Sequence, residues 1–305
     1  MATQVTYQPE HVGDWGAAAA VDGGRYETGT MKMKDGTDIF YRAWLHPDAQ
    51  RPVLILMHGL GAHTGWFIDM GNSLHEQGLT VYAHDHRGFG RSSGGRGHAT
   101  EPQTNVRDAE AILAEIRRRH PSAPVSILGH SLGALFALHM AADDSAATQH
   151  QLAGVILVNP GMAVAWKVPL GRQAAVAMGG LSGSTRQWSI APGHESMTEN
   201  AEAKRMLDAD TYWQRSQTAS FIYHVGLRLR VAAMRRAPSV HTPALVIQCE
   251  GDKSVVSAAS RRCYDKLGSS DKTWKTYPNF AHDFEFEQDR GLLDADLVAW
   301  VMGHR

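Results

Sequence analysis

The sequence feature that most constrains this chain is the run Gly129-His130-Ser131-Leu132-Gly133. A β-branched apolar run precedes it at residues 125–128, and an apolar helical pattern continues to residue 138. A serine between a strand and a helix, flanked by glycines, is typical of a nucleophile elbow. The turn is so sharp that only glycine-sized neighbours avoid collision, and it lifts the serine hydroxyl above the sheet. Ser131 is therefore a candidate nucleophile, although a glycine-bracketed turn can also contain a serine without function.

Length, composition and charge exclude several classes of protein. The 305 residues permit one large α/β domain or two smaller ones, and a formal net charge of −1 gives no electrostatic case for binding nucleic acid or an anionic membrane. The start of the chain lacks the pattern of a signal peptide, and no apolar run is long enough to cross a bilayer. We therefore predict a cytoplasmic protein without a transmembrane segment. The two cysteines cannot form a disulfide framework, and Cys249, at the end of an apolar run, is predicted to be a buried thiol.

Alternating strand-like and helical segments predict an α/β fold with a mostly parallel central sheet flanked by helices. Residues 1–24 are predicted to be a loose lead-in, and two alternating runs around Asp35-Gly36 predict a β-hairpin. The alternation is lost over residues 161–241, which contain several Met and Trp residues. We expect this segment to be a cap, or lid, inserted between two parts of the core, residues 25–160 and 242–305. Its apolar residues suit a pocket for an acyl chain, but most of them are also expected to pack the lid onto the core.

A glycine-rich loop, residues 58–66, follows the apolar strand-like run at residues 52–57. Such a loop brings backbone N–H groups close to a ligand. The Leu60 N–H and the Leu132 N–H, directly after the candidate nucleophile, are thus predicted to be the two donors of an oxyanion hole. The alternative is a strand-to-helix turn with no such role.

Two further candidates follow later strands. Asp252 lies just past residues 244–250, and His282 lies in a loop after residues 273–277. A serine hydroxyl is a poor nucleophile until an imidazole accepts its proton, and a carboxylate can fix the tautomer of that imidazole. We therefore predict a catalytic triad of Ser131, His282 and Asp252. Three neighbours are less suitable: His130 is expected to be a packing or hydrogen-bonding residue, Asp283 to point the wrong way, and Glu250 to lie within its strand.

No metal site is predicted. The run His84-Asp85-His86 and the nearby His98 lack a second cluster of ligands at metal-binding spacing. Asp85 and Arg87 are instead expected to fix their loop by pairing with the backbone and with each other.

The assembled motifs resemble those of the serine α/β-hydrolases, in the branch of monoacylglycerol lipases and lysophospholipases. The matching runs, which extend from about residue 26 to the C-terminus, include residues 58–65, 85–92, 129–133, 251–252 and 282–287. The resemblance implies an α/β-hydrolase fold with a cap, a Ser-Asp-His triad, no cofactor, and esters of medium or long acyl chains as substrates, such as monoacylglycerols, lysolipids or alkyl and aryl esters. Ala62 and Trp66 stand where the branch often has Glu and Arg, which makes the entrance more apolar.

Other functions on the same fold remain open from the sequence. A proline-type aminopeptidase needs lid carboxylates to hold an amine, and Glu195, Glu199 and Glu202 are candidates. An acyltransferase or perhydrolase differs only in the nucleophile that deacylates the enzyme. Epoxide hydrolases and dehalogenases use an aspartate where this chain has Ser131, so the sequence argues against both. It also argues against a non-catalytic binding protein, which is expected to lack a member of the triad.

Overall fold

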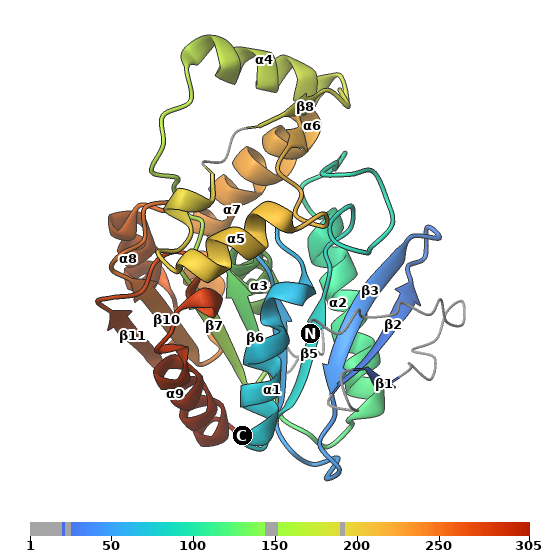
Figure 1. Cartoon of the computed structure of the whole chain (residues 1–305), viewed down its shortest axis with the longest axis vertical. Helices are drawn as coiled ribbons and strands as arrows, with labels where there is room; N and C mark the ends of the chain where they lie inside the picture. Colours follow the sequence, from blue (N-terminus) through green and yellow to red (C-terminus); the bar gives the residue numbers. More distant parts are fainter. Residues whose placement is uncertain (1–19, 22–25, 144–151, 190–192) are drawn as a thin grey trace.

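The strand Val53–Met57 (β4) shows how the central sheet is built, because all five of its side chains are buried. Val53, Ile55 and Met57 pack into one apolar core, and Leu54 and Leu56 pack into a second. Successive side chains of a strand point to opposite faces, so the sheet has a core on each side. The protein, in a computed structural model that describes residues 20–21, 26–143, 152–189 and 193–305, thus has a sheet between two layers of helices (Figure 1).

The described strands of the main sheet follow the order β1-β2-β3-β5-β4-β6-β7-β10-β11. Their bounds are β1 Ala20–Val21, β2 Tyr26–Lys32, β3 Asp38–Trp44, β5 Thr80–His84, β6 Val125–His130, β7 Gly154–Val158, β10 Ala244–Cys249 and β11 Lys272–Tyr277. The pairs from β1 to β5 are antiparallel, and all pairs from β5 through β11 are parallel. This confirms the mostly parallel sheet and the hairpin, β2–β3. Of the predicted lead-in, all but Ala20–Val21 lies outside the described residues.

Helices cover both faces of the sheet. α1 (Ile68–Glu76) and α9 (Arg290–Gly303) contribute to the core on one face. α2 (Thr104–Arg119), α3 (Leu132–Ala142) and α8 (Ser257–Lys266) contribute to the core on the other. Cys249 is a buried free thiol at the end of β10, as the sequence predicts. Within the described ranges, no helix has both the length and the apolar character that a membrane span requires.

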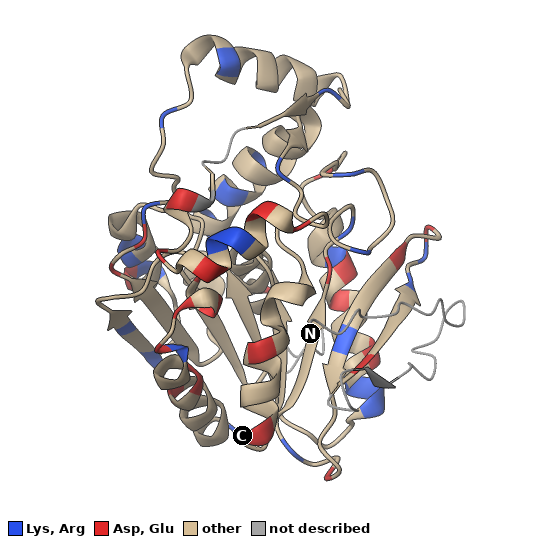
Figure 2. Cartoon of the chain, viewed as in Figure 1, with Lys and Arg blue, Asp and Glu red and all other residues tan. Residues whose placement is uncertain are grey.

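The segment between β7 and β10, which we propose is the lid, lies beyond one end of the sheet (Figure 1). Its elements are α4 Leu170–Leu181, β8 Gln187–Trp188, a 3₁₀ turn His194–Ser196, α5 Ala201–Ala209, β9 Gln217–Thr218, α6 Ala219–Phe221, a π-helical stretch Ile222–Leu229, α7 Arg230–Arg236 and a 3₁₀ turn Ala237–Ser239. α4 contains a single charged residue, Arg172 (Figure 2). Met178 and Leu181 on α4 are exposed, so these two apolar residues neither line a pocket nor pack the lid onto the core.

Candidate active site

Ser131 lies in the turn between β6 and α3, with φ 51° and ψ −107°. A positive φ is strained for any residue other than glycine, and it persists only where the surroundings hold it. The flanking glycines allow this turn because the chain is crowded there. A Cβ on Gly129 would lie 2.3 Å from the Gly133 carbonyl oxygen, and a Cβ on Gly133 would lie 2.3 Å from that of Met57. The local geometry is therefore that of a strand–elbow–helix unit.

The structure brings Ser131, His282 and Asp252 together. The His282 Nε2 lies 3.0 Å from the Ser131 Oγ, and its Nδ1 lies 2.7 Å from Asp252 Oδ2. A carboxylate can only accept, so the Nδ1–H of His282 donates to it and Nε2 is left to accept from the serine hydroxyl. The other oxygen of Asp252 accepts the N–H groups of Ser254 and Val255, at 2.6 and 3.0 Å. The arrangement can remove the proton from Ser131 and stabilise the resulting imidazolium.

The two predicted oxyanion donors come from different elements but line the same cavity as Ser131. Leu132 is the first residue of α3, and an N–H in the first turn of a helix has no acceptor within that helix. The loop that carries Leu60 passes close to the candidate nucleophile: a Cβ on Gly59 would lie 3.3 Å from the Ser131 Cβ. The role of both N–H groups as oxyanion donors stays a prediction.

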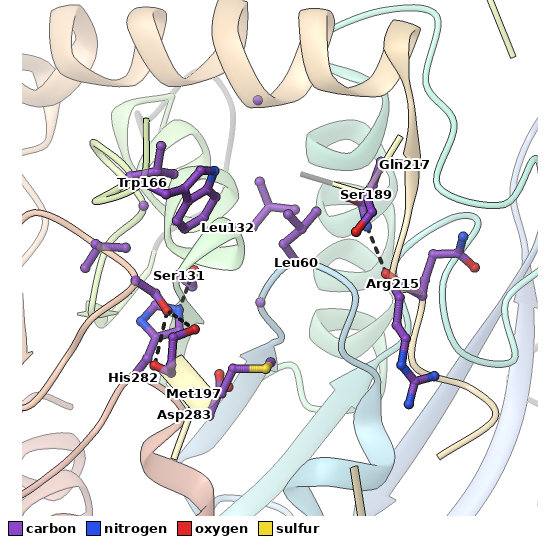
Figure 3. A pocket seen from close by; sticks show the side chains of 18 of the residues that line it. Leu60, Ser131, Leu132, Trp166, Ser189, Met197, Arg215, Gln217, His282 and Asp283 are labelled. Carbon is purple, nitrogen blue, oxygen red and sulfur yellow. Dashed lines mark hydrogen bonds between the residues drawn. The ribbon is translucent and has the colours of Figure 1, made fainter. Parts of the chain in front are cut away.

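A cavity of about 360 Å³ extends from the Ser131 hydroxyl under the lid. Figure 3 shows Ser131 and His282 side by side, with Leu60, Leu132 and Trp166 near them. The lining is mainly apolar, and it includes Leu60, Leu135, Val164, Trp166, Phe221 and Ile222. Among the residues that the structure describes, the lid carboxylates considered for an aminopeptidase, Glu195, Glu199 and Glu202, are not part of this lining.

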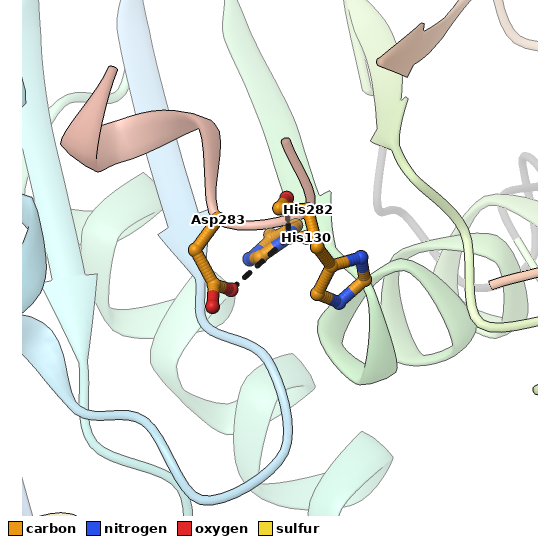
Figure 4. A group of neighbouring side chains, drawn as sticks. All are labelled: His130, His282 and Asp283. Atoms are coloured by element: carbon orange, nitrogen blue, oxygen red, sulfur yellow. Dashed lines mark hydrogen bonds and ion pairs between the residues drawn. The ribbon is translucent and has the colours of Figure 1, made fainter. Parts of the chain in front are cut away.

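His130 and Asp283 lie beside the candidate triad but make different contacts. The Nε2–H of His130 donates to the His282 carbonyl oxygen at 2.9 Å, as expected for a hydrogen-bonding neighbour. The Asp283 carboxyl lies 3.7 Å from the same His130 nitrogen and faces away from the His282 ring (Figure 4). His130, His282 and Asp283 form the one group in the described residues with atoms placed to hold a metal ion. Both ring nitrogens of His282 already have partners, so this group does not favour a metal site.

Comparison with known proteins assigns the family. Residues 48–289 match the hydrolase family described as serine aminopeptidase, S33. The chain belongs to this family. It is 26% identical over 272 residues to a monoacylglycerol lipase of Mycolicibacterium smegmatis, covering 88% of this chain and 94% of that one. It is also 26% identical to human monoglyceride lipase, covering 81% of this chain and 80% of that one.

Solved structures agree on the fold of this S33-family hydrolase. A monoacylglycerol lipase of Paleococcus ferrophilus superimposes with a TM-score of 0.76 at 24% identity, over 88% of this chain and 99% of that one. A monoglyceride lipase variant from Saccharomyces cerevisiae gives a TM-score of 0.77 at 20% identity, over 91% and 94% of the two chains. The predicted membership of the monoacylglycerol-lipase-like branch of α/β-hydrolases is confirmed.

Sequence reasoning missed one residue of this hydrolase that holds the candidate base. Asn159, directly after β7, is buried and has a φ of 44°. Its Nδ2 donates to the His282 carbonyl oxygen at 2.8 Å, and its Oδ1 accepts the Cys249 N–H at 2.7 Å. Asn159 thus ties β10 to the loop that carries His282. The signal was an asparagine directly after a buried strand, because Asn tolerates a left-handed backbone better than most residues.

The predicted pairing of Asp85 with Arg87 is wrong. Asp85 accepts the N–H groups of Thr64 and Arg91, at 2.6 and 2.7 Å, so its pairing with the backbone is as expected. Arg87 instead pairs with Asp108 on α2 and with Asp35 in the β2–β3 hairpin. The backbone N–H groups already occupy both Asp85 oxygens, and Arg87 is long enough to reach two other elements.

Asp210 joins the lid to the loop that carries Leu60. Its Oδ2 accepts the Nε2–H of His63 and the Nε1–H of Trp66, each at 2.8 Å. Nearby, the Gln214 N–H donates to the Gly61 carbonyl oxygen at 2.9 Å. Burial alone would raise the pKa of Asp210, but the hydrogen bonds from His63 and Trp66 outweigh it and lower that pKa to about 2. The carboxylate therefore remains ionised, and the contact remains intact, at neutral pH.

We expect Asp210→Ala to lower the melting temperature by roughly 5–10 °C and kcat/KM for esters by about tenfold. Each lost hydrogen bond to a carboxylate is typically worth about 1.5–3 kcal/mol, and the candidate oxyanion loop loses its contact with the lid. Thermal unfolding and steady-state kinetics measure both effects. Asp265→Ala is the control, because Asp265 makes an exposed pair with Arg261 and its loss is expected to change little. Equal effects of the two substitutions would contradict the role of Asp210.

Glu285 is a buried carboxyl beside the candidate active site, and its ionisation can be tested. Its side chain is buried, with one oxygen 3.8 Å from His130 Nδ1, and burial raises its pKa from 4.5 to about 8. In the unfolded chain this carboxyl ionises near pH 4.5, whereas in the folded protein it holds its proton up to about pH 8. The free energy of unfolding therefore falls as the pH rises through this window.

The glutamine in Glu285→Gln cannot ionise. We therefore expect the melting temperature of this variant, relative to that of the wild type, to be several degrees higher at about pH 8.5 than at about pH 5. The comparison uses thermal unfolding of both proteins at each pH. Glu202→Gln, on an exposed face of α5, is the control and should show the same difference at both pH values. A difference for Glu285→Gln that does not change with pH would show that the carboxyl ionises normally in the fold.

Proposed function

We propose that the protein is a serine carboxylester hydrolase that cleaves acyl esters through an acyl-enzyme on Ser131. The observation that carries this proposal is the hydrogen-bonded path from Ser131 through His282 to Asp252 at the end of a largely apolar cavity. The named relatives are monoacylglycerol and monoglyceride lipases, which agrees with an ester substrate.

In the proposed reaction, the Ser131 Oγ attacks the carbonyl carbon of the ester while His282 Nε2 takes the hydroxyl proton. The former carbonyl oxygen becomes negatively charged, and it accepts hydrogen bonds from the backbone N–H groups of Leu60 and Leu132. The intermediate then expels the alcohol, which receives the proton from His282, and leaves the acyl group on Ser131. A water molecule, deprotonated by the same imidazole, releases the carboxylic acid and restores the serine. Asp252 stabilises the imidazolium in both halves of the reaction.

The cavity favours acyl groups longer than acetyl. Apolar side chains dominate its lining, and each buried methylene adds roughly 0.8 kcal/mol of binding free energy, about fourfold in kcat/KM, until the pocket is filled. Monoacylglycerols, lysolipids and simple alkyl or aryl esters are the proposed substrates. The cytoplasmic location stays a prediction from the sequence.

A chain-length series of 4-nitrophenyl esters, assayed beside monoacylglycerols, tests this proposal. We expect kcat/KM to rise from acetate to medium-length chains, and fastest turnover of the acetate would contradict it. An aminoacyl arylamide in the same assay tests the aminopeptidase alternative. We expect no turnover of the arylamide, because Glu195, Glu199 and Glu202, the lid carboxylates predicted to bind an amine, do not line the described cavity.

A further inference from the structure

Arg230 lies on the side of a lid helix that faces the candidate active site. α6, the π-helical stretch and α7 run without interruption from Ala219 to Arg236. The residues of this run that line the cavity of Ser131 are Phe221, Ile222, Gly226 and Arg230, and the last three are spaced four residues apart along one face. Val225 and Leu229 are buried in the apolar core, and Arg228 is exposed. The helix therefore presents a cation to a cavity whose lining is mainly apolar and whose other charged residues are Asp208, Arg215 and Asp283.

Arg230 has no ion pair or hydrogen bond among the residues that the structure describes. It is half-buried, and burial lowers its pKa with no neighbouring carboxylate to oppose the change. The other arginine on the cavity wall differs: Arg215 donates to the carbonyl oxygens of Leu207 and Asp210, at 2.7 and 3.2 Å, and lies over the Trp213 ring. A half-buried guanidinium without an anion is unfavourable, because it loses hydration and gains no partner.

Arg230 also lines a second cavity, and Arg230 and Val164 are the two residues that line both cavities. The residues there are apolar apart from two arginines, and they include Met162, Leu227, Val231 and Met234. The aliphatic part of Arg230 can pack against these side chains while its guanidinium remains available to a ligand.

We propose that Arg230 binds an anionic group of the substrate, so that the enzyme prefers esters that carry a carboxylate or a phosphate over their neutral counterparts. This inference rests on the proposed function and narrows its substrate class. A planar guanidinium with five donors matches both anions and can bind either through two parallel hydrogen bonds. The anion can come from two sources: a carboxylate at the far end of the acyl chain, or a phosphate on the alcohol.

Two matched pairs of substrates separate these sources. The first pair is 4-nitrophenyl octanoate and the mono-4-nitrophenyl ester of suberic acid, which differ by a terminal carboxylate. The second is a 1-acylglycerol and the same 1-acylglycerol carrying a 3-phosphate. We expect the wild type to favour the charged member in one pair, and that pair identifies the source. Arg230→Met should lower the charged-to-neutral ratio of kcat/KM in this pair between tenfold and a hundredfold.

Arg230→Lys is the second variant, since it keeps the charge but loses the planar fork, and an intermediate ratio is expected. Arg228→Met is the matched control on the exposed face of the same helix, and its ratios should equal those of the wild type. Ratios that Arg230→Met leaves unchanged in both pairs, or a wild type that favours the neutral member in both, would overturn the inference. Hydrolysis of the neutral esters by the wild type reports separately on the proposed function.

Discussion

Ser131→Ala is expected to lower kcat for ester hydrolysis by about six orders of magnitude while the protein remains folded. Loss of the nucleophile removes the acyl-enzyme route, and the residual rate over water then comes from oxyanion stabilisation and binding alone. The methyl side chain of alanine fits the space, but it retains the positive φ of 51° that already strains this turn. Steady-state kinetics on a medium-chain 4-nitrophenyl ester, with a thermal unfolding curve for each protein, measure the effect.

Ser189→Ala is the matched control for this substitution, because Ser189 lines the same cavity and lies away from the triad (Figure 3). We expect its kcat to stay within a few-fold of the wild type. Full esterase activity in Ser131→Ala would show that another group is the nucleophile.

Asp252→Asn is expected to lower kcat by about four orders of magnitude with little change in stability. The amide can donate to His282 Nδ1, which leaves the proton on the nitrogen that must accept from the serine. The two N–H groups that bind the other Asp252 oxygen, from Ser254 and Val255, keep an acceptor in the amide oxygen. The same kinetic assay measures the loss.

Asp283→Asn separates this effect from a general response to an Asp-to-Asn substitution beside His282. Asp283 is next to His282 in the chain, but its carboxyl faces His130, and burial raises its pKa well above the usual range. Replacing a carboxyl that is held protonated removes little charge, so a change in kcat of less than about tenfold is expected. Equal losses in the two variants would mean that Asp252 has no special part in orienting the imidazole.

The core could be predicted from the sequence because its signals are local. An apolar run such as residues 53–57 predicts a buried strand, and the parallel sheet then gathers the residues that follow its strands at one edge. This is why Ser131, Asp252 and His282 are found together although 121 and 30 positions separate them along the chain (131 to 252, 252 to 282).

The contacts of the lid could not be predicted in this way. Asp210 meets His63 across 147 positions, and nothing near either residue in the sequence indicates the other. Met178 and Leu181 are apolar, as residues that line a pocket often are, yet both are exposed on the surface of α4. The position of Arg230 on the cavity wall follows only from the helix face that it shares with Phe221 and Gly226. In each case the tertiary arrangement decides what the side chain contacts.

The central claim is that the Ser131 hydroxyl is activated by the His282 imidazole. Treatment with a fluorophosphonate, followed by mass spectrometry of the intact protein and of its peptides, tests this claim most directly. In the wild type we expect one phosphonyl adduct per chain, formed rapidly on Ser131. In His282→Ala we expect the adduct to form about as slowly as it does on a free serine. An unlabelled protein, or an adduct on a different residue, would contradict the claim.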